Sequence, residues 1–437
     1  MRSAGSAYGA DGMGSPPSSD PGVPVDRRTQ PLASRRDFLG RLGRGAGLAA
    51  AMWLGACEFD PDVSPPTASG GEGQAPVDWE AWWSAKSRSG RVNFANWPYY
   101  IDFRKGGRPS LDAFTRETGI RVNYFHTIDG NESFMREIEP YLEADLPPFY
   151  DVIVMTNGPE VSRLVNSGFL TPLDSSRLVN FEEHASDLVR DPAWDPGNRF
   201  SVAWQSGLTG IAYRPEAREA LGHAPSSIGD LFDPALEGRV GMMSDLQDLG
   251  SAGLLAIGVE PGSSTEQDWV QAADRLREQR AEGLAAGYYD QSYVRALVRG
   301  DVWICQAWSG DVFQQQQLGR DLEFVVPEEG AMLWTDSMMI PRNARHPVDA
   351  MMIMDFVYRP DIAAMIADWV WYVCPVPAAA RIIEKRFDHP EVANSPLVFP
   401  PADATGPAGR FLEYRVFEGD DDAAAWASIF GTIPAGL

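Results

Sequence analysis

Apolar positions along the chain change between two spacings. Strand-like and helix-like segments alternate along the chain. Arg91–Trp97 has apolar residues at alternate positions and Tyr150–Met155 contains an apolar run, whereas apolar residues recur every three to four positions in Ser110–Thr118 and Val161–Ser167. The first helical segment begins at Ser110, a residue type that favours the N-cap position, and ends before Gly119. Strands that alternate with helices predict an α/β sheet with parallel neighbours.

A second pattern of the same kind follows the apolar run 200–213. About 350 residues in such segments are more than one ordinary hydrophobic core contains. The sequence therefore predicts an α/β fold of two lobes, and it shows no internal repeat. The predicted elements of the second part are the strands 238–243 and 302–308 and the helices 253–257, 264–278 and 347–357.

The segment 326–341 places one carboxylate, Asp336, between two apolar runs, with Trp334 two positions before it. In an extended strand these two side chains point to the same side. A carboxylate among apolar residues is costly to bury unless a positive group lies against it, and an aromatic face also attracts a cation. The pair predicts a site for a desolvated ammonium ion. The alternative is a core tryptophan followed by a surface aspartate.

Other polar and aromatic residues follow predicted strands. Trp97 and Thr156 stand at the ends of two strands, where parallel α/β sheets collect their ligands. Asp245 and Asp248 follow a third strand, and they also suit the N-cap and first turn of a helix. These positions are the candidates for further ligand contacts.

The first 56 residues have the pattern of an export signal. Twin arginines in Ser34–Leu39 precede an apolar run, Leu42–Ala56, that is too short for a membrane span. Leu54–Cys57 resembles a bacterial lipobox, which predicts a lipid on Cys57 and a tethered protein in the periplasm or at the cell surface; the alternative is a signal without lipid and a chance cysteine. Residues 57–88, rich in Pro, Ser, Gly and acids, are predicted to be a flexible tether.

Charge and cysteine content narrow the class of protein. The net charge is -24 and residues 1–56 contribute +3, so the mature chain carries about -27. Nucleic-acid binding requires a basic footprint, whereas an acidic protein suits cationic ligands; acidity that serves solubility alone is the alternative. The sequence leaves open whether Cys305 and Cys374 pair.

Features of an enzyme are missing from the sequence. The five histidines are scattered without the spacing of metal ligands. No Gly-rich phosphate loop and no nucleophile elbow follows a strand. We therefore expect a protein that is not an enzyme and that needs no metal.

A set of short segments occurs in a recognisable order and spacing: Asn96–Tyr100, Phe114–Gly119, Tyr150–Val154, Gly168–Asp174, Asp195–Phe200, Thr209–Tyr213, Gly238–Met242, Ala307–Asp311, Pro327–Gly330 and Trp334–Ser337. With these segments, residues 90–420 resemble the spermidine/putrescine-binding proteins of bacterial ABC importers. The resemblance implies a receptor that captures a polyamine-like cation, requires no cofactor, works as a monomer and delivers its ligand to a permease in the membrane.

The resemblance also implies a two-lobed clamshell of the periplasmic-binding-protein type, with a mixed sheet flanked by helices in each lobe. Crossing hinge segments join the lobes, and we expect them near 205–207, 333–335 and 378–382. The implied division places residues 89–206 and 335–380 in lobe 1 and residues 207–334 and 381–437 in lobe 2.

The ligand of such a protein lies between the lobes, among aromatic rings and carboxylates. The resemblance assigns Asp336 as the central anchor, Asp245 and Asp248 as a pair near one amine, and Thr156 as a small hydroxyl contact. The aromatic walls that it implies are Trp97, Tyr99 or Tyr100, Trp308 and Trp334.

The chain departs from the family pattern at two places. Gln205 and Ser206 stand where the family has an aromatic residue, and Cys374 replaces a tyrosine, with Tyr372 two positions earlier. The identity of the amine therefore stays open. Three alternatives remain: a ferric-ion binder that uses a pair such as Tyr288-Tyr289, a binder of another organic cation, and a receptor that senses rather than transports.

Overall fold

The computed structural model describes residues 77–104, 106–404 and 409–435. The predicted export signal, Cys57 and residues 57–76 of the predicted tether lie outside these ranges. Within the tether, Trp79–Ser84 forms helix α2, and the side chain of Asp78 caps it by accepting a hydrogen bond from the Ala81 N–H at 3.0 Å. None of the helices in the described ranges is long and apolar enough to cross a membrane.

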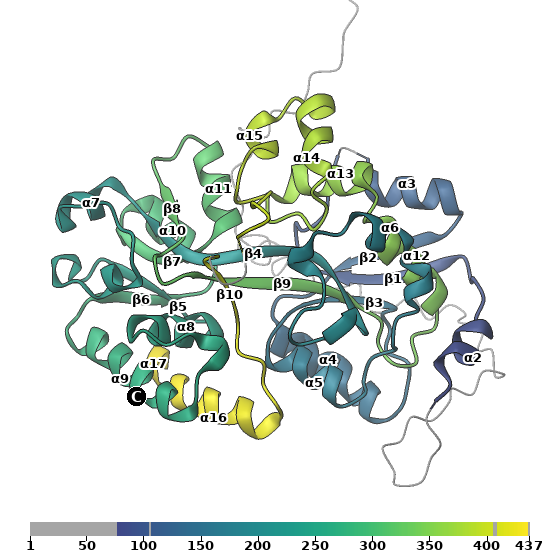
Figure 1. Cartoon of the computed structure of the whole chain (residues 1–437), viewed down its shortest axis with the longest axis horizontal. Helices are drawn as coiled ribbons and strands as arrows, with labels where there is room; N and C mark the ends of the chain where they lie inside the picture. The colour runs from purple at the N-terminus through teal and green to yellow at the C-terminus, as the bar shows by residue number, and fades with distance from the viewer. Residues whose placement is uncertain (1–76, 105, 405–408, 436–437) are drawn as a thin grey trace, which may run out of the picture. The chain divides into compact units, whose positions relative to one another are not determined.

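The first part of the fold alternates strands and helices close to the predicted bounds (Figure 1). Its elements are β1 (Arg91–Asn96), α3 (Pro109–Thr118), β2 (Arg121–His126), α4 (Asn131–Glu143), β3 (Val152–Thr156), α5 (Pro159–Asn166) and α6 (Val179–His184).

The second part contains the longest strands and the C-terminal helices. Its strands are β4 (Ser201–Tyr213), β5 (Val240–Met243), β6 (Ala285–Tyr289), β7 (Ile304–Trp308), β8 (Glu323–Val325), β9 (Ala331–Met339) and β10 (Phe411–Glu413). Its helices are α7 (Pro215–Leu221), α8 (Leu246–Ala256), α9 (Glu266–Ala281), α10 (Tyr293–Arg299), α11 (Ser309–Gln317), α12 (Pro347–Phe356), α13 (Pro360–Val370), α14 (Ala379–Ile382), α15 (Pro390–Ala393), α16 (Asp420–Phe430) and α17 (Thr432–Ala435).

The strands form one mixed sheet in the order β2-β1-β3-β9-β4-β7-β5-β6, with β10 paired to β9 and β8 to β4. Both ends of this order are parallel, as the strand–helix rhythm predicts: β1 pairs with β2 and β3, and β5 with β6 and β7. The central strands β4 and β9 run antiparallel to each other and to their neighbours β7 and β3. The predicted α/β class with a mixed sheet is confirmed.

Strands β4 and β9 belong to both halves of the sheet. They pair from Ser201 opposite Met339 to Thr209 opposite Met332, with an irregularity between Ala203 and Gln205. β3 pairs with one end of β9, and β7 pairs with the opposite end of β4. These two strands are therefore the crossing segments that join the halves (Figure 1).

A third crossing segment lies at Val373, where a single bridge pairs it with Ser206. The Ser206 N–H donates to the Val373 carbonyl at 3.0 Å, and the Val373 N–H donates to the Ser206 carbonyl at 2.8 Å. The segment expected here, 378–382, forms helix α14 instead. The division of the chain into lobes at the residues given above stays a prediction.

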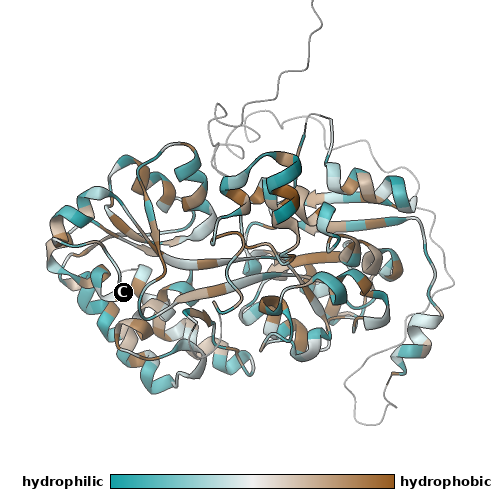
Figure 2. Cartoon of the chain, turned by 45° about the horizontal axis from the view of Figure 1, so that its top comes forward, coloured by the Kyte–Doolittle hydropathy of each residue, from teal (hydrophilic) through white to brown (hydrophobic). Residues whose placement is uncertain are grey.

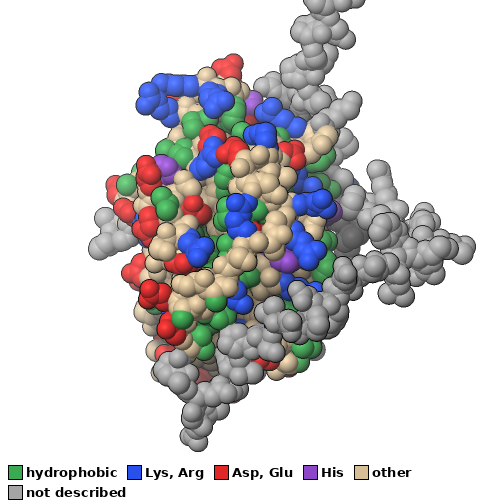
Figure 3. Space-filling view, turned by 90° about the vertical axis from the view of Figure 1, so that its right-hand side faces the viewer, with side chains coloured by type: hydrophobic (Ala, Val, Ile, Leu, Met, Phe, Trp, Pro, Cys, Tyr) green, Lys and Arg blue, Asp and Glu red, His purple; other side chains and the backbone are tan. Residues whose placement is uncertain are grey.

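Apolar residues of the strands and of the helices form the hydrophobic clusters of the fold. The helices carry both hydrophilic and hydrophobic residues along their length (Figure 2). Phe94 and Trp204 are almost fully buried and meet edge to face at 5.5 Å. Charged side chains of both signs are scattered among hydrophobic and other side chains on the face shown in Figure 3. Cys305 and Cys374 are free thiols, and both are buried.

Two local predictions need correction. Ser110 is not the N-cap of α3, because the cap is Arg108; the Ser110 N–H and hydroxyl instead donate to the buried carboxylate of Asp102. Helix α8 begins at Leu246, seven residues before the predicted helix, with Asp245 as its N-cap. Glycines hid its beginning, since they disfavour helices, but Gly250 is needed because the ring of Trp426 would lie 2.2 Å from a Cβ there.

Candidate functional site

Several of the predicted site residues lie on the face of the sheet that is centred on β4. Gln205, Gly207 and Thr209 alternate along this face. Their register partners on the neighbouring strands are Asp336 opposite Gln205, Trp334 opposite Gly207, and Trp308 opposite Thr209. Side chains that are directly opposite in antiparallel strands leave the sheet on the same face. Trp308, Trp334 and Asp336, widely separated in the sequence, therefore share one face of the sheet.

Asp336 is a buried carboxylate, 5% exposed, in the middle of β9. Thr156 is its register partner on β3, and the Thr156 hydroxyl donates a hydrogen bond to Asp336 Oδ1 at 2.5 Å. The side chain of Asn131 exchanges hydrogen bonds with the Thr156 backbone, at 2.8 and 3.2 Å, and so holds the end of β3 in place. The predicted Thr156 and Asp336 therefore form one polar row across the sheet.

Trp334 lies next to this row and is 8% exposed. A Cβ at Gly207 would lie 2.2 Å from Trp334 Cζ2, so the indole covers the β4 backbone only because residue 207 is a glycine. The edge of Trp334 meets Tyr372 at 5.2 Å, and Tyr372 meets Tyr100 at 5.8 Å. Three rings from separate segments thus form one aromatic wall.

Trp97 and Tyr99 lie in different environments after β1. Trp97 is half-buried and packs against both main hydrophobic clusters. Tyr99 has a φ of 59° and is 61% exposed, whereas Tyr100 is 7% exposed and its carbonyl accepts a hydrogen bond from Trp204 at 3.0 Å. Of the two tyrosines considered from the sequence, Tyr100 is the one that joins the aromatic wall.

A second polar group forms at the N-terminus of α8. Asp245 Oδ1 accepts hydrogen bonds from the N–H groups of Gln247 and Asp248, at 2.9 and 3.0 Å, as an N-cap does. Asp248 is 3% exposed, and its Oδ2 accepts a hydrogen bond from the Trp308 indole at 3.0 Å. Asp248 thus fixes the orientation of Trp308, and Asp245 has the capping position that the sequence suggested, while its contact with a ligand stays a prediction.

Electrostatics distinguish Asp248 from an ordinary surface carboxyl. Burial raises its pKa to about 7, and the negative charge of Asp245 adds to this, against hydrogen bonds that include that of Tyr414. Burial also raises the pKa of Glu160 in α5, with a further contribution from Asp245. The charge of Asp245 is therefore felt in α5 as well as at its own helix.

The raised pKa of Asp248 predicts how stability changes with pH. An unfolded aspartate ionises near pH 4, so between about pH 4 and 7 the folded state retains a proton that the unfolded state has lost. Stability from this group is complete below pH 4 and is lost as pH rises to about 7, by at most about 1.4 kcal/mol per pH unit. Asp248→Asn should remove this loss. The urea midpoint of the variant should therefore rise relative to that of the wild type between pH 5 and pH 7.

Asp268→Asn is the matched control for the pH measurement, because Asp268 is an exposed carboxyl whose hydrogen bonds from Thr265 lower its pKa. The urea midpoint of Asp268→Asn should not rise relative to that of the wild type between pH 5 and pH 7. Equal pH profiles for Asp248→Asn and the wild type would contradict the raised pKa.

Residues outside the predicted site set connect the two polar groups. Asp311 is buried and accepts hydrogen bonds from the hydroxyls of Tyr372 at 2.9 Å and Tyr293 at 3.0 Å. Tyr293 in turn accepts from the Trp308 N–H at 2.9 Å. Tyr414, 166 residues from Asp248 in the sequence, donates to it. No local pattern marks these partners, because each contact depends on the sheet topology.

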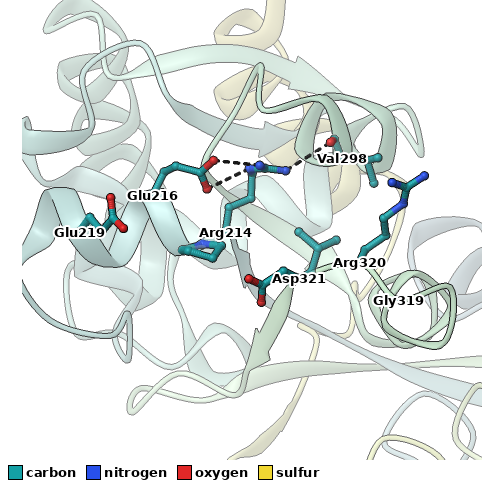
Figure 4. Close-up of a pocket in the computed structure, with 9 residues that line it drawn as sticks. Arg214, Glu216, Glu219, Val298, Gly319, Arg320 and Asp321 are labelled. Carbon is teal, nitrogen blue, oxygen red and sulfur yellow. Dashed lines mark hydrogen bonds and ion pairs between the residues drawn. The ribbon is translucent and has the colours of Figure 1, made fainter.

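Features outside this face do not join it. Tyr288 and Tyr289 lie on β6, with β5, β7 and β4 between them and β9. A recess of about 510 Å³ beside Arg214 contains none of the predicted site residues (Figure 4). Glu216 holds Arg214 there at 2.9 Å. The described ranges contain no group of three or more His, Cys, Asp or Glu placed to hold a metal ion.

The fold and the carboxylates among aromatic rings define the class of protein as a two-lobed solute-binding protein. Residues 147–404 match the family described as bacterial extracellular solute-binding protein, and the chain belongs to this family.

Characterised relatives cover most of the chain. The spermidine/putrescine-binding periplasmic protein of Escherichia coli is 28% identical over 311 residues, which cover 71% of this chain and 83% of the relative. The putrescine/cadaverine-binding protein of Pseudomonas aeruginosa is 28% identical over 318 residues, 70% of this chain and 84% of the relative. These relatives are substrate-binding proteins, and the first is periplasmic.

Solved structures show the same fold. The spermidine/putrescine ABC transporter substrate-binding protein PotD of Streptococcus pneumoniae superimposes with a TM-score of 0.65 at 22% identity, covering 79% of this chain and 99% of that one. The Tp0655 (TpPotD) lipoprotein of Treponema pallidum gives 0.61 at 18% identity, covering 78% and 99%. The two-lobed periplasmic-binding-protein fold is therefore confirmed.

Proposed function

We propose that this protein is the substrate-binding receptor of an ABC importer and that it captures a polyamine-like cation between its lobes. The observation that supports this most is the row of Thr156 and Asp336 beside Trp334. A buried carboxylate favours an ammonium group, and an indole face favours both the ammonium and the methylene chain of a diamine. The relatives that bind spermidine, putrescine or cadaverine point to the same ligand class.

The proposal assigns two ends to the site. Asp336 and Thr156 hold one amino group, with Trp97, Tyr100 and Trp334 around it. Asp245 and Asp248 lie near the other amino group, with Trp308 oriented by Asp248 as a second wall. Two strands, β4 and β7, lie between β9, which carries Asp336, and β5, which precedes Asp245. An elongated dication rather than a compact one therefore spans both ends.

The cellular part of the proposal rests on the sequence. We place the protein in the periplasm or at the cell surface, exported by the twin-arginine route, anchored through a lipid on Cys57, and acting as a monomer that delivers its ligand to a membrane permease. Labelling of the exported protein with a tagged fatty acid tests the anchor; failure to label under conditions that label a known lipoprotein would refute it.

A thermal-shift panel tests the ligand class directly. Putrescine, spermidine and agmatine should raise the unfolding temperature of the purified protein, whereas ferric citrate should not. A bound ligand at about 100 times its Kd stabilises by about 2.7 kcal/mol. Stabilisation by ferric citrate alone, with a new visible absorbance, would overturn the proposal in favour of an iron-binding protein.

A further inference from the structure

Gln205 is the polar side chain that β4 places beside Asp336. The two residues are register partners on neighbouring antiparallel strands, so their side chains leave the sheet on the same face. Gln205 is 2% exposed, and its amide nitrogen donates to the Trp204 carbonyl at 2.6 Å. Only the nitrogen of an amide can donate, so this bond fixes the orientation of the side chain.

The other end of the amide is an acceptor that lacks a donor. Among the described residues, Gln205 Oε1 is buried without a hydrogen-bond partner, and the indole N–H of Trp334 is too. A buried acceptor without a donor costs free energy comparable to a lost hydrogen bond. A ligand that donates an N–H group to Gln205 Oε1 would therefore remove this free-energy cost on binding.

An unpaired carbonyl alone does not identify a binding site. Gln279 in α9 is also buried with an unpaired Oε1, and its nitrogen donates to the Leu231 carbonyl at 2.7 Å. Gln205 differs because its register partner is the carboxylate of Asp336 and because Trp334 lies on the same face. Two different acceptors and an aromatic wall are thus neighbours on one face of the sheet.

We propose that Gln205 makes this site selective for amines with several N–H donors at the bound end, and that it excludes quaternary amines. This inference rests on the function proposed above. Aromatic rings with a carboxylate bind quaternary ammonium ions well, so the walls and Asp336 alone give little selection. A primary ammonium or a guanidinium donates to Asp336 and to Gln205 Oε1 together, whereas a trimethylammonium group leaves Oε1 without a donor.

Calorimetric titration of the purified protein with two diamines tests this selectivity. The probes are putrescine and its bis-quaternary analogue, in which each nitrogen carries three methyl groups. We expect the wild type to bind putrescine at least tenfold more tightly. Gln205→Met has nearly the same volume but no acceptor, so it should weaken putrescine binding about tenfold and reduce the ratio between the two ligands.

Two further variants make the outcome specific. Gln205→Glu retains an acceptor and should keep the preference for putrescine. This variant therefore tests the inference even if Gln205→Met does not fold. Gln279→Met, the matched control in α9, should leave the ratio unchanged. An unchanged ratio in a folded Gln205→Met overturns the inference, whereas no binding of any amine by the wild type overturns the proposed function instead.

Discussion

Asp336→Asn is expected to weaken putrescine binding at least tenfold, about 1.4 kcal/mol, without lowering the unfolding temperature of the ligand-free protein. The carboxylate is buried in β9, and under the proposed function it lies against one amino group of the ligand. Asparagine retains the acceptor for the Thr156 hydroxyl and the shape of the side chain, but it lacks the charge. Calorimetric titration gives the affinity, and thermal unfolding gives the stability.

Asp349→Asn is the control for this prediction, because Asp349 is an equally buried carboxylate with a structural role. Its Oδ2 accepts hydrogen bonds from the N–H groups of Ser89 and Gly90, each at 2.9 Å, and so holds the entrance to β1. This variant should lose stability and keep its affinity. If Asp336→Asn binds putrescine as tightly as the wild type, the ammonium group lies elsewhere.

Trp334→Ala is expected to lower the free energy of unfolding by about 3–5 kcal/mol and to weaken putrescine binding at least tenfold. The ring packs over Gly207 and against Tyr372, so its removal leaves a cavity between the crossing strands as well as an open wall. Urea unfolding and calorimetric titration measure the two losses separately.

Trp269→Ala separates the two effects, since Trp269 is a buried indole in α9 that packs against Trp426 at 5.2 Å. It should lose comparable stability while the affinity of the folded protein is unchanged. Equal affinity losses in both variants would mean that general destabilisation, rather than a missing ring in the site, explains the effect of Trp334→Ala.

Local sequence patterns predicted most of the fold because the strands and helices here carry their own signals. β1 alternates apolar and polar residues, β3 is an apolar run of strand length, and β9 has apolar runs on both sides of Asp336. Gly119 ends α3 in the left-handed conformation that its residue type favours. The pattern missed β6, β8 and β10, whose half-buried and exposed residues give no clear alternation. Their strand conformation comes from pairing with neighbours.

The candidate site could be predicted as single residues but not as contacts. Asp336 and Trp334 were identified because a carboxylate in an apolar strand is unusual. Their neighbours depend on which strands pair. The antiparallel pairing of β4 with β9 cannot be predicted from the pattern of either segment alone. For this reason Gln205 was noted only as a departure from a pattern, and Tyr414 was not noted at all.

Ser206 of β4 contacts both of the other crossing segments that join the halves of the sheet. It exchanges two backbone hydrogen bonds with Val373, and its hydroxyl lies 2.9 Å from that of Thr335, its partner on β9. The three crossing segments are therefore hydrogen-bonded to one another and form one narrow ribbon. Narrow ribbons twist strongly, whereas sliding of one crossing segment past another would break the hydrogen bonds between them. A torque on either half of the sheet consequently acts on all three crossing segments together. A change that makes one segment more rigid therefore makes the whole hinge more rigid.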